Sequence, residues 1–258
     1  MLSAIFLSHI SYFALFIVVI SMALFEYYRI LKIKASQPQI VGGYVSAVVL
    51  FAVTFFHAAG ILPLYAVVLV IPVVSIVFIL ELFKKSETSF QNIGFTFLGL
   101  IYIVLPFSLT NYLVVGSKAG NIDYNPQILL GVLFMIWAND SFAYLFGVSL
   151  GKNKMFPRIS PKKSWEGFIG GLLSTIGVSI AISYLFNSVE QFDWIVIAVL
   201  VVVFGTFGDL VESMLKRNFG VKDSGNIMPG HGGILDRFDS LILAIPMVYA
   251  YLTFFEKI

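Results

Sequence analysis

Charged side chains gather around a glycine-rich stretch near the end of the sequence. Asp236, Arg237 and Asp239 follow closely after the run Gly230-His231-Gly232-Gly233. Asp236 and Asp239 are three residues apart, so on a helix both carboxylates project from one face and repel each other unless a cation lies between them. Glycines before a helix let backbone N–H groups approach an anion, and the helix N-terminus adds about half a positive charge. The spacing therefore predicts a metal site beside an anion site.

Two further carboxylates can join that metal site. Asp209 precedes the glycine-rich stretch, and Asp140 lies inside an earlier apolar run. Carboxylate oxygens are the hard ligands that Mg²⁺ prefers. An ionisable group deep in an apolar helix is costly and usually faces a polar cavity. The alternatives are an ion pair that holds helices together for Asp140, a charge preference of the helix start for Asp236 and Asp239, and a plain connecting turn for the glycines.

A long pattern of unlike residue types surrounds these carboxylates. It reads SMLKR from Ser213 to Arg217, KDSG from Lys222 to Gly225, and PGHGGILDRFD from Pro229 to Asp239. This pattern resembles the signature of the phosphatidate cytidylyltransferase (CDP-diacylglycerol synthase) family. One mild departure is Met228, where Leu, Ile or Phe is usual, and its similar volume should leave the chemistry unchanged. Further similarity to the family covers Asp140–Tyr144, Gly147, Gly151-Lys152 and Ser160–Gly167.

The resemblance implies an enzyme that converts CTP and phosphatidate into CDP-diacylglycerol and pyrophosphate with Mg²⁺, a second cation being a further option. The implied catalytic residues are Asp236, Asp239, Lys222, Arg237 and His231, the last in an orienting role. The implied substrate-binding residues are Lys216, Arg217, Ser213, Asp223, Gly232, Gly233, Lys162, Lys163 and Ser164. The implied metal ligands are Asp236, Asp239, Asp209 and Asp140. For Lys162 and Lys163 the alternative is anchoring at the membrane surface.

The composition places the chain in a membrane. Hydrophobic residues make up 59% and charged residues 12%, with a mean hydropathy of +0.95, whereas soluble chains carry about 25% charged residues. The net charge of +2 is too small to imply nucleic acid, and the absence of cysteine excludes disulfides, thiolate zinc sites and cysteine nucleophiles. The partners that the resemblance implies are the two substrates, CTP and phosphatidate, and the apolar composition adds membrane lipid, with a homodimer as a further option.

Eight apolar runs are long enough to be membrane helices, which need about 20 residues to cross roughly 30 Å of hydrocarbon. The first is too long for a signal peptide and reads as a retained anchor. A ninth, short helix can fit in the longer loops. The runs extend from Ile5 to Glu26, Ile40 to Ala59, Ile61 to Phe83, Ile93 to Val115, Ile128 to Leu150, Phe168 to Phe186, Trp194 to Leu210 and Ile234 to Phe255.

We therefore expect an all-α, polytopic membrane helix bundle with a polar cavity that faces the cytoplasm. The whole chain, 1–258, forms one integral membrane domain. Residues 1–126 supply N-terminal helices as a lipid-facing scaffold, and residues 127–258 form the catalytic half. Long loops in a compact bundle usually carry function, so we assign it to the cytoplasmic loops 151–167 and 211–233.

The positions of the basic residues give the orientation in the cell (inner) membrane. With both termini outside, all of the 16 Lys and Arg residues except Lys118 and Lys257 lie on the cytoplasmic side. This agrees with the positive-inside rule. A missing helix would invert every later loop and destroy the asymmetry. The active site is accordingly expected to face the cytoplasm.

Two other functions compete with this interpretation. A related CTP-using lipid enzyme, such as a polyprenol kinase or another lipid cytidylyltransferase, would share parts of the cavity chemistry. An ion-coupled transporter would also place carboxylates inside the membrane. Against the transporter, the charges cluster on one side, and no pair of broken helices occurs in matching halves.

Overall fold

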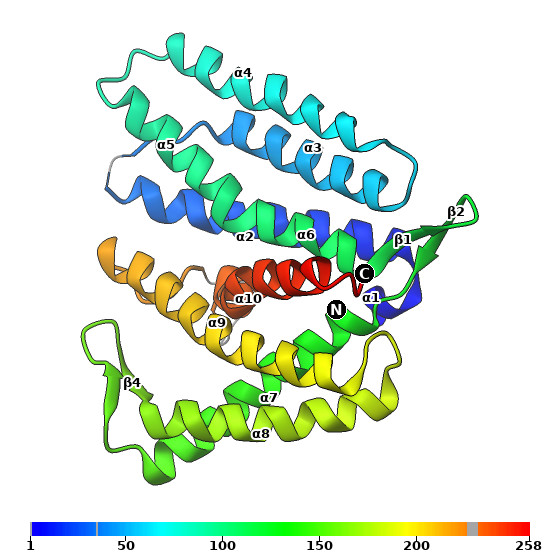
Figure 1. Cartoon of the computed structure of the whole chain (residues 1–258). Helices are drawn as coiled ribbons and strands as arrows, with labels where there is room; N and C mark the ends of the chain where they lie inside the picture. Colours follow the sequence, from blue (N-terminus) through cyan, green and yellow to red (C-terminus); the bar gives the residue numbers. More distant parts are fainter. Residues whose placement is uncertain (1, 35, 226–231) are drawn as a thin grey trace. The chain divides into compact units, whose positions relative to one another are not determined.

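The computed structural model describes residues 2–34, 36–225 and 232–258. Within them, eight helical segments are long and apolar enough to cross a membrane, which confirms the expected all-α polytopic architecture (Figure 1). The spans are His9–Lys32, Ile40–Ala58, Leu64–Leu82, Ser89–Val114, Gln127–Leu150, Trp165–Leu185, Gln191–Asn218 and Leu235–Phe254.

The predicted first helix is divided into two. A short helix, α1 (Leu2–Leu7), precedes the spanning helix α2 (His9–Lys32). The break is a capping box at Ser8, whose Oγ accepts from the backbone N–H of Ser11 at 3.2 Å while Ser11 Oγ accepts from the N–H of Ser8 at 3.1 Å. Such a reciprocal pair satisfies two donors that a helix start leaves without partners.

The chain divides into two compact units. Unit 1 comprises Met1–Asn125 and Phe219–Arg237, and unit 2 comprises Pro126–Asn218 and Phe238–Ile258. Residues 219–237 belong to the catalytic half of the sequence analysis, and the described residues among them, 219–225 and 232–237, group with the N-terminal helices in the structure. One contact in that grouping is the ring of Phe219, whose centroid lies 6.3 Å from that of Phe95.

Unit 1 is built around helix α3 (Ile40–Ala58), which packs against α2, α4 (Val70–Leu82) and α6 (Leu105–Val114) (Figure 1). A 3₁₀ turn, η1 (Leu64–Leu69), leads into α4. A π turn, η2 (Leu100–Val104), joins α5 (Ser89–Gly99) to α6 just before Pro106, which has no N–H to give to a regular helix.

The core of unit 1 contains a polar network as well as apolar side chains. The buried hydroxyl of Tyr12 lies 2.6 Å from Thr110 Oγ1 and donates to Asn111 Oδ1 at 3.0 Å. Asn111 Nδ2 in turn donates to Thr54 Oγ1 at 2.8 Å. Buried polar groups are tolerated when they are hydrogen-bonded in this way, so the network ties α2, α3 and α6 together.

A short β-ribbon ends the first segment of unit 1, Met1–Asn125. Strand β1 (Val115–Lys118) pairs antiparallel with β2 (Asn121–Tyr124). The hydroxyl of Tyr124 donates to the carbonyl oxygen of Ile5, and burial raises the pKa of Tyr124 above its usual range. The ribbon is thereby held to helix α1.

Unit 2 consists of α7 (Gln127–Leu150), the ribbon β3 (Lys154–Phe156) and β4 (Ser160–Ser164), α8 (Trp165–Leu185), α9 (Gln191–Asn218) and most of α10 (Leu235–Phe254). Helices α7 and α8 pack closely because α8 carries glycines at the contact. A Cβ on Gly167 would lie 2.7 Å from the carbonyl oxygen of Ala143, and one on Gly171 would lie 2.5 Å from Asn139 Oδ1. The glycines therefore serve helix packing, since small residues let two helix backbones approach closely.

The two predicted functional loops are more regular than expected. The 151–167 segment forms the β3–β4 ribbon. Helix α9 continues beyond the predicted end at Leu210 to Asn218, so the first part of the 211–233 segment is helical. The stretch contains neither Gly nor Pro, Glu212 forms an ion pair with Lys216 one turn later, and Lys216 and Arg217 complement the dipole at the helix C-terminus.

Candidate functional site

A cavity of about 720 Å³ lies in unit 2. Its walls come from α7, the β3–β4 ribbon, α8 and α9, with Ser240 from α10. Cavities of roughly 300–1,000 Å³ are typical of small-molecule sites. The charged and polar side chains that line it include Asn139, Asp140, Lys162, Lys163, Ser164 and Asp209.

An ion pair spans this cavity lining. Lys163 Nζ lies 2.7 Å from Asp209 Oδ2 and also donates to the carbonyl oxygen of Thr206 at 3.3 Å. The hydroxyl of Ser213, one helical turn after Asp209, donates to Asp209 Oδ1 at 3.2 Å. The predicted residues Lys163, Asp209 and Ser213 therefore form one connected group, and Thr206 contributes a carbonyl that the sequence analysis did not identify.

Asp239 belongs to the same group. Its carboxylate interacts electrostatically with Asp209, Asp140 and Lys163, and its Oδ1 accepts from the backbone N–H of Ser240. Gly208 makes this approach possible, because a Cβ there would overlap the carbonyl oxygen of Asp239. Glycine lets α9 and α10 approach closely just where each helix carries a carboxylate.

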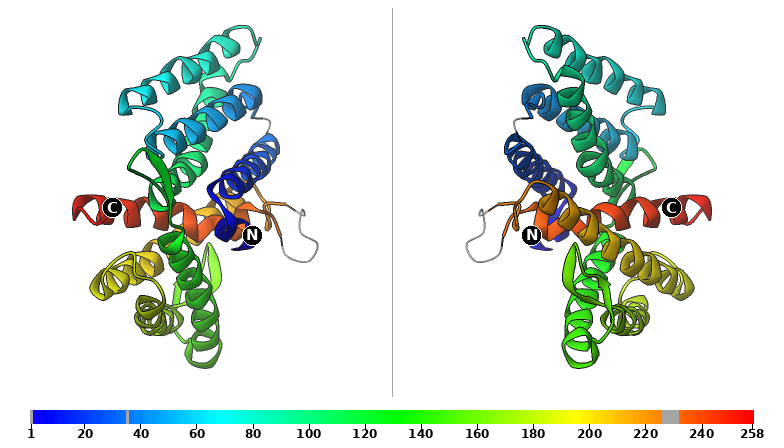
Figure 2. Two further views of the ribbon diagram at one scale, coloured as in Figure 1. Left: turned by 90° about the vertical axis from the view of Figure 1, so that its right-hand side faces the viewer. Right: turned by 90° about the vertical axis from the view of Figure 1, so that its left-hand side faces the viewer.

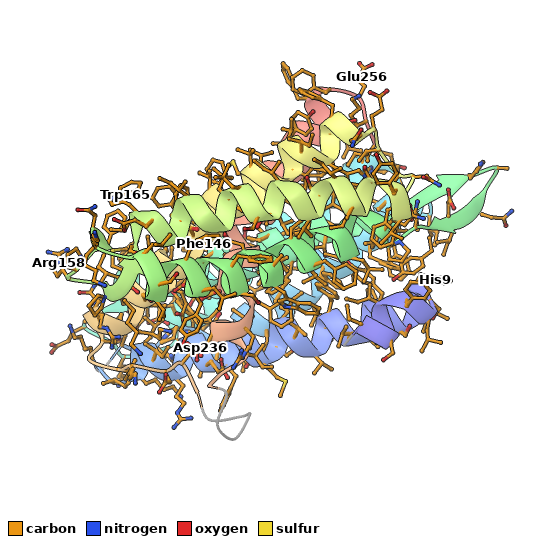
Figure 3. All side chains as sticks on the ribbon, turned by 90° about the horizontal axis from the view of Figure 1, so that it is seen from below. His9, Phe146, Arg158, Trp165, Asp236 and Glu256 are labelled. Atoms are coloured by element: carbon orange, nitrogen blue, oxygen red, sulfur yellow. The ribbon has the colours of Figure 1, made fainter. Side chains whose placement is uncertain are left out.

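The β3–β4 ribbon positions the lysines. Backbone N and side-chain Nδ2 of Asn153 donate to the Glu166 carboxylate, at 3.1 and 2.7 Å to Oε1, which fastens the start of the ribbon to α8. Figure 3 shows Arg158 and Trp165 at the same end of unit 2. Lys162 is exposed and Lys163 half-buried, so both line the cavity from β4.

Ser164 has a structural role in addition to its place in the cavity lining. It is the N-cap of α8, and its Oγ accepts from the N–H of Gly167 at 3.2 Å. A serine at this position satisfies one of the orphan donors of the helix. Its predicted contact with substrate remains a prediction.

The other predicted residues fall at the end of α9 and in unit 1. Lys216 is buried and paired with Glu212, while Arg217 is exposed. In unit 1, Lys222, Asp223 and Arg237 are exposed, and Gly232 has a φ of +81°, which favours glycine. His231, with the preceding Gly230, lies outside the described residues.

Asp236 is a hydrogen-bond acceptor for the segment that precedes its own helix. Its Oδ2 accepts from the N–H of Gly233 at 2.8 Å, from the N–H of Ser224 at 3.0 Å and from Ser224 Oγ at 2.9 Å. Figure 3 shows Asp236 beside the ribbon of α2. The sequence predicts an anion site at the start of α10. In the structure, the carboxylate of Asp236 itself accepts hydrogen bonds there, including the one from the N–H of Gly233.

Three carboxylates of unit 2 are the candidate metal ligands. Asp140, Asp209 and Asp239 offer only carboxylate oxygens, the ligand type that Mg²⁺ prefers. Within residues 2–34, 36–225 and 232–258, no three His, Cys, Asp or Glu side chains converge at coordinating distance. The ammonium group of Lys163 offsets the charge of Asp209 in this arrangement.

Comparison with known proteins identifies the family. A model of the cytidylyltransferase family matches residues 1–255. The chain belongs to the cytidylyltransferase family. The resemblance inferred from the Ser213–Asp239 pattern is therefore confirmed, and it extends through the N-terminal helices that the sequence analysis treated as a scaffold.

Several curated relatives carry the name phosphatidate cytidylyltransferase. The one from Bacillus subtilis (strain 168) is 39% identical over 249 residues, which is 92% of this chain and 86% of that protein. The one from Staphylococcus aureus (strain COL) is 38% identical over 213 residues, 81% of this chain and 78% of that protein. The Staphylococcus haemolyticus protein is 39% identical over 167 residues, 64% of this chain.

Proposed function

We propose that this member of the cytidylyltransferase family is a phosphatidate cytidylyltransferase that forms CDP-diacylglycerol and pyrophosphate from CTP and phosphatidate. The observation that carries the proposal is the similarity to the Bacillus subtilis protein of that name over 92% of the chain. The cavity supports it, because lysines and carboxylates from the motif segments meet there. CTP and phosphatidate both bring phosphate groups that such a lining can bind.

The reaction needs positioning more than acid–base chemistry. The phosphate of phosphatidate is already ionised at neutral pH, and its oxygen attacks the α-phosphorus of CTP in line. A new P–O bond forms, the bond to the β-phosphate breaks, and pyrophosphate leaves with the electron pair. Lys162 and Lys163 would bind phosphate oxygens and hold the two substrates in line, and Asp209 would orient the Lys163 ammonium group.

A divalent cation is part of this proposal. Asp140, Asp209 and Asp239 of unit 2 would hold Mg²⁺, and a second cation is a further option. Asp236 of unit 1, the fourth carboxylate that the sequence predicts, stays a candidate that mutation must test. When bound, the ion would offset phosphate charge and stabilise the departing pyrophosphate. Lys216, Arg217, Lys222 and Arg237 would contribute further positive charge around the nucleotide.

The orientation of the chain completes the proposal. We place the β3–β4 ribbon and the α9–α10 connection in the cytoplasm and both termini outside, in the cell membrane. CTP would then arrive from the cytosol, and phosphatidate would enter from the inner leaflet.

An isotope experiment tests the reaction directly. The purified full-length protein in phosphatidate-containing micelles receives Mg²⁺ and CTP labelled with ³²P at either the α- or the γ-phosphate. Cytidylyl transfer places the α-label in the lipid and the γ-label in pyrophosphate. A lipid kinase would instead place the γ-label in the lipid and release CDP.

Two comparisons sharpen this test. CTP should support turnover far better than ATP, GTP or UTP at equal concentration. The same protein in sealed vesicles distinguishes a transporter, which would take up ions without any requirement for CTP. Absence of lipid-bound α-label under all these conditions would overturn the proposed function.

A further inference from the structure

A buried carboxylate in α2 holds the segment that leads into α10. Glu26 is 1% exposed, and its carboxylate accepts three hydrogen bonds from that segment. Oε1 accepts from the N–H of Ile234 at 2.9 Å, and Oε2 accepts from the N–H of Leu235 at 2.8 Å and from Ser224 Oγ at 2.9 Å. Figure 2 shows the segment before α10 (orange) beside α2 (blue). All of these residues belong to unit 1.

Two of these bonds cap helix α10 from a different helix. The first N–H groups of a helix have no partner within it. Glu26 satisfies those of Ile234 and Leu235, and Asp236 satisfies that of Gly233. The negative charge also lies at the positive end of the helix dipole, which is favourable. The start of α10 is thus fixed by a residue far earlier in the chain. Glu26 precedes Ile234 by 208 residues and Leu235 by 209 residues.

Glu26 also explains two glycines of the motif. A Cβ on Gly225 would lie 2.6 Å from Glu26 Oε1, and a Cβ on Gly233 would overlap Glu26 Oε2. Real Cβ atoms do not approach an oxygen so closely, so a larger residue at either position would displace the carboxylate. The segment is therefore shaped to fit around Glu26.

Ser224 links Glu26 to Asp236. The Ser224 hydroxyl lies 2.9 Å from both Glu26 Oε2 and Asp236 Oδ2, and the Ser224 N–H donates to Asp236 at 3.0 Å. A change at Glu26 would move Ser224 and, through it, the carboxylate of Asp236.

We infer that Glu26 is a positioning residue for the transfer reaction: it sets the start of α10 and the placement of Asp236 and Arg237. The inference rests on the proposed function. Burying a carboxylate is costly unless it is well hydrogen-bonded, and the three bonds described above come from residues of the 213–239 segment. Helix α2 is thus more than lipid-facing scaffold, because it carries part of the support of the active site.

The test compares two buried carboxylates of unit 1. Glu26→Gln keeps the side-chain size but removes the charge and one of the two acceptor oxygens. Glu81→Gln is the matched control. Glu81 is 2% exposed and accepts from the side-chain amides of Asn92 and Gln39, two residues that lie outside the 213–239 segment. Both full-length variants are purified and compared for thermal stability, turnover at saturating substrates, and backbone amide exchange.

Glu26→Gln should lower kcat at least about tenfold, since small displacements of catalytic groups have large effects on rate. Amide exchange in residues 232–240 should become faster in Glu26→Gln and stay unchanged in Glu81→Gln. Adding Ser224→Ala to Glu26→Gln should lower kcat by less than the product of the two single effects, because the residues act through one network. Wild-type kcat in Glu26→Gln, or equal losses of kcat in both Gln variants that follow their losses of stability, would overturn the inference.

Amide exchange separates this inference from the proposed function. If the wild-type protein transfers no cytidylyl group, the proposed function fails, and the exchange measurement still decides whether Glu26 fixes the start of α10. Unchanged exchange in residues 232–240 of Glu26→Gln would then overturn the role of Glu26 by itself.

Discussion

Lys163 Nζ and Asp209 Oδ2 lie 2.7 Å apart, which joins strand β4 to helix α9 at the cavity. The lysine also donates to the carbonyl of Thr206, so its ammonium group is fixed in position before any ligand binds. A preorganised cation of this kind is more effective toward phosphate than a mobile surface lysine, because less ordering is needed on binding.

The first prediction separates the two neighbouring lysines of β4. Lys163→Met should raise the KM for CTP at least about tenfold, the loss expected when a charge-assisted hydrogen bond of about 1.5–3 kcal/mol is removed. Lys162→Met should have a smaller effect, because Lys162 is exposed and is not among the described ion pairs. Steady-state kinetics with varied CTP measures both. Equal changes in the two variants would contradict a special role for Lys163.

The second prediction concerns Asp239 as a metal ligand. Asp239→Asn keeps the size and polarity of the side chain but removes its charge, so the protein should still fold. Turnover should fall at least about a hundredfold, since losing one preorganised electrostatic partner costs roughly 3 kcal/mol. Half-saturation by Mg²⁺ should move to a higher concentration, which a general loss of stability would not produce.

The control for Asp239→Asn is Asp123→Asn, which alters an exposed carboxylate of the β1–β2 ribbon and should leave turnover unchanged. Asp236→Asn should behave like Asp239→Asn if both carboxylates bind the ion. Near-normal turnover with an unchanged Mg²⁺ titration in both Asp236→Asn and Asp239→Asn would refute their assignment, and would move the ion to Asp140 and Asp209.

The fold was predictable because hydropathy determines it directly. Each spanning helix needs its own long apolar run, and the eight runs correspond to the eight helical spans found among the residues that the structure describes. The boundaries were less accurate where capping decides them. The break at Ser8 depends on a serine pair that apolar counting does not detect, and the extension of α9 to Asn218 depends on polar residues that still favour a helix.

Which candidate site residues lie close together was predictable only for residues that stand in a local sequence motif. Asp140, Lys163 and Asp239 stand in such motifs, and the structure brings them together with Asp209 in unit 2. Glu26 could not be identified in this way, because its partners are about 200 residues away and the sequence shows only an acidic residue near a helix end. The carbonyl of Thr206 was equally hidden, since any residue type supplies one.

The third prediction tests the orientation. The chain has no cysteine, so single substitutions report cleanly. Cysteine at Glu87 or Arg158 should react with a membrane-impermeant maleimide only from the cytoplasmic side, and cysteine at Lys118 only from outside. These three positions are exposed in the structure. Labelling of Glu87→Cys and Lys118→Cys from the same side would show that the proposed topology is incorrect.

The last prediction concerns the close approach of α9 and α10. A Cβ on Gly208 would overlap the carbonyl oxygen of Asp239 and lie 3.2 Å from the Cα of Ser240, both of which are backbone atoms that cannot rotate away. Gly208→Ala should therefore push the two helices apart and separate Asp209 from Asp239. Gly177→Ala is the matched control, because Gly177 lies inside α8 and a Cβ there meets no heavy atom within 4 Å.

We expect Gly208→Ala to lose most of its turnover and to require more Mg²⁺, since the separation of two carboxylates that share an ion weakens its binding. Gly177→Ala should keep wild-type turnover and the wild-type Mg²⁺ titration. Thermal unfolding in detergent distinguishes local displacement from global damage. Turnover in Gly208→Ala equal to that of Gly177→Ala would mean that the helices tolerate the extra methyl group, and that the contact between α9 and α10 does not set the distance between the carboxylates.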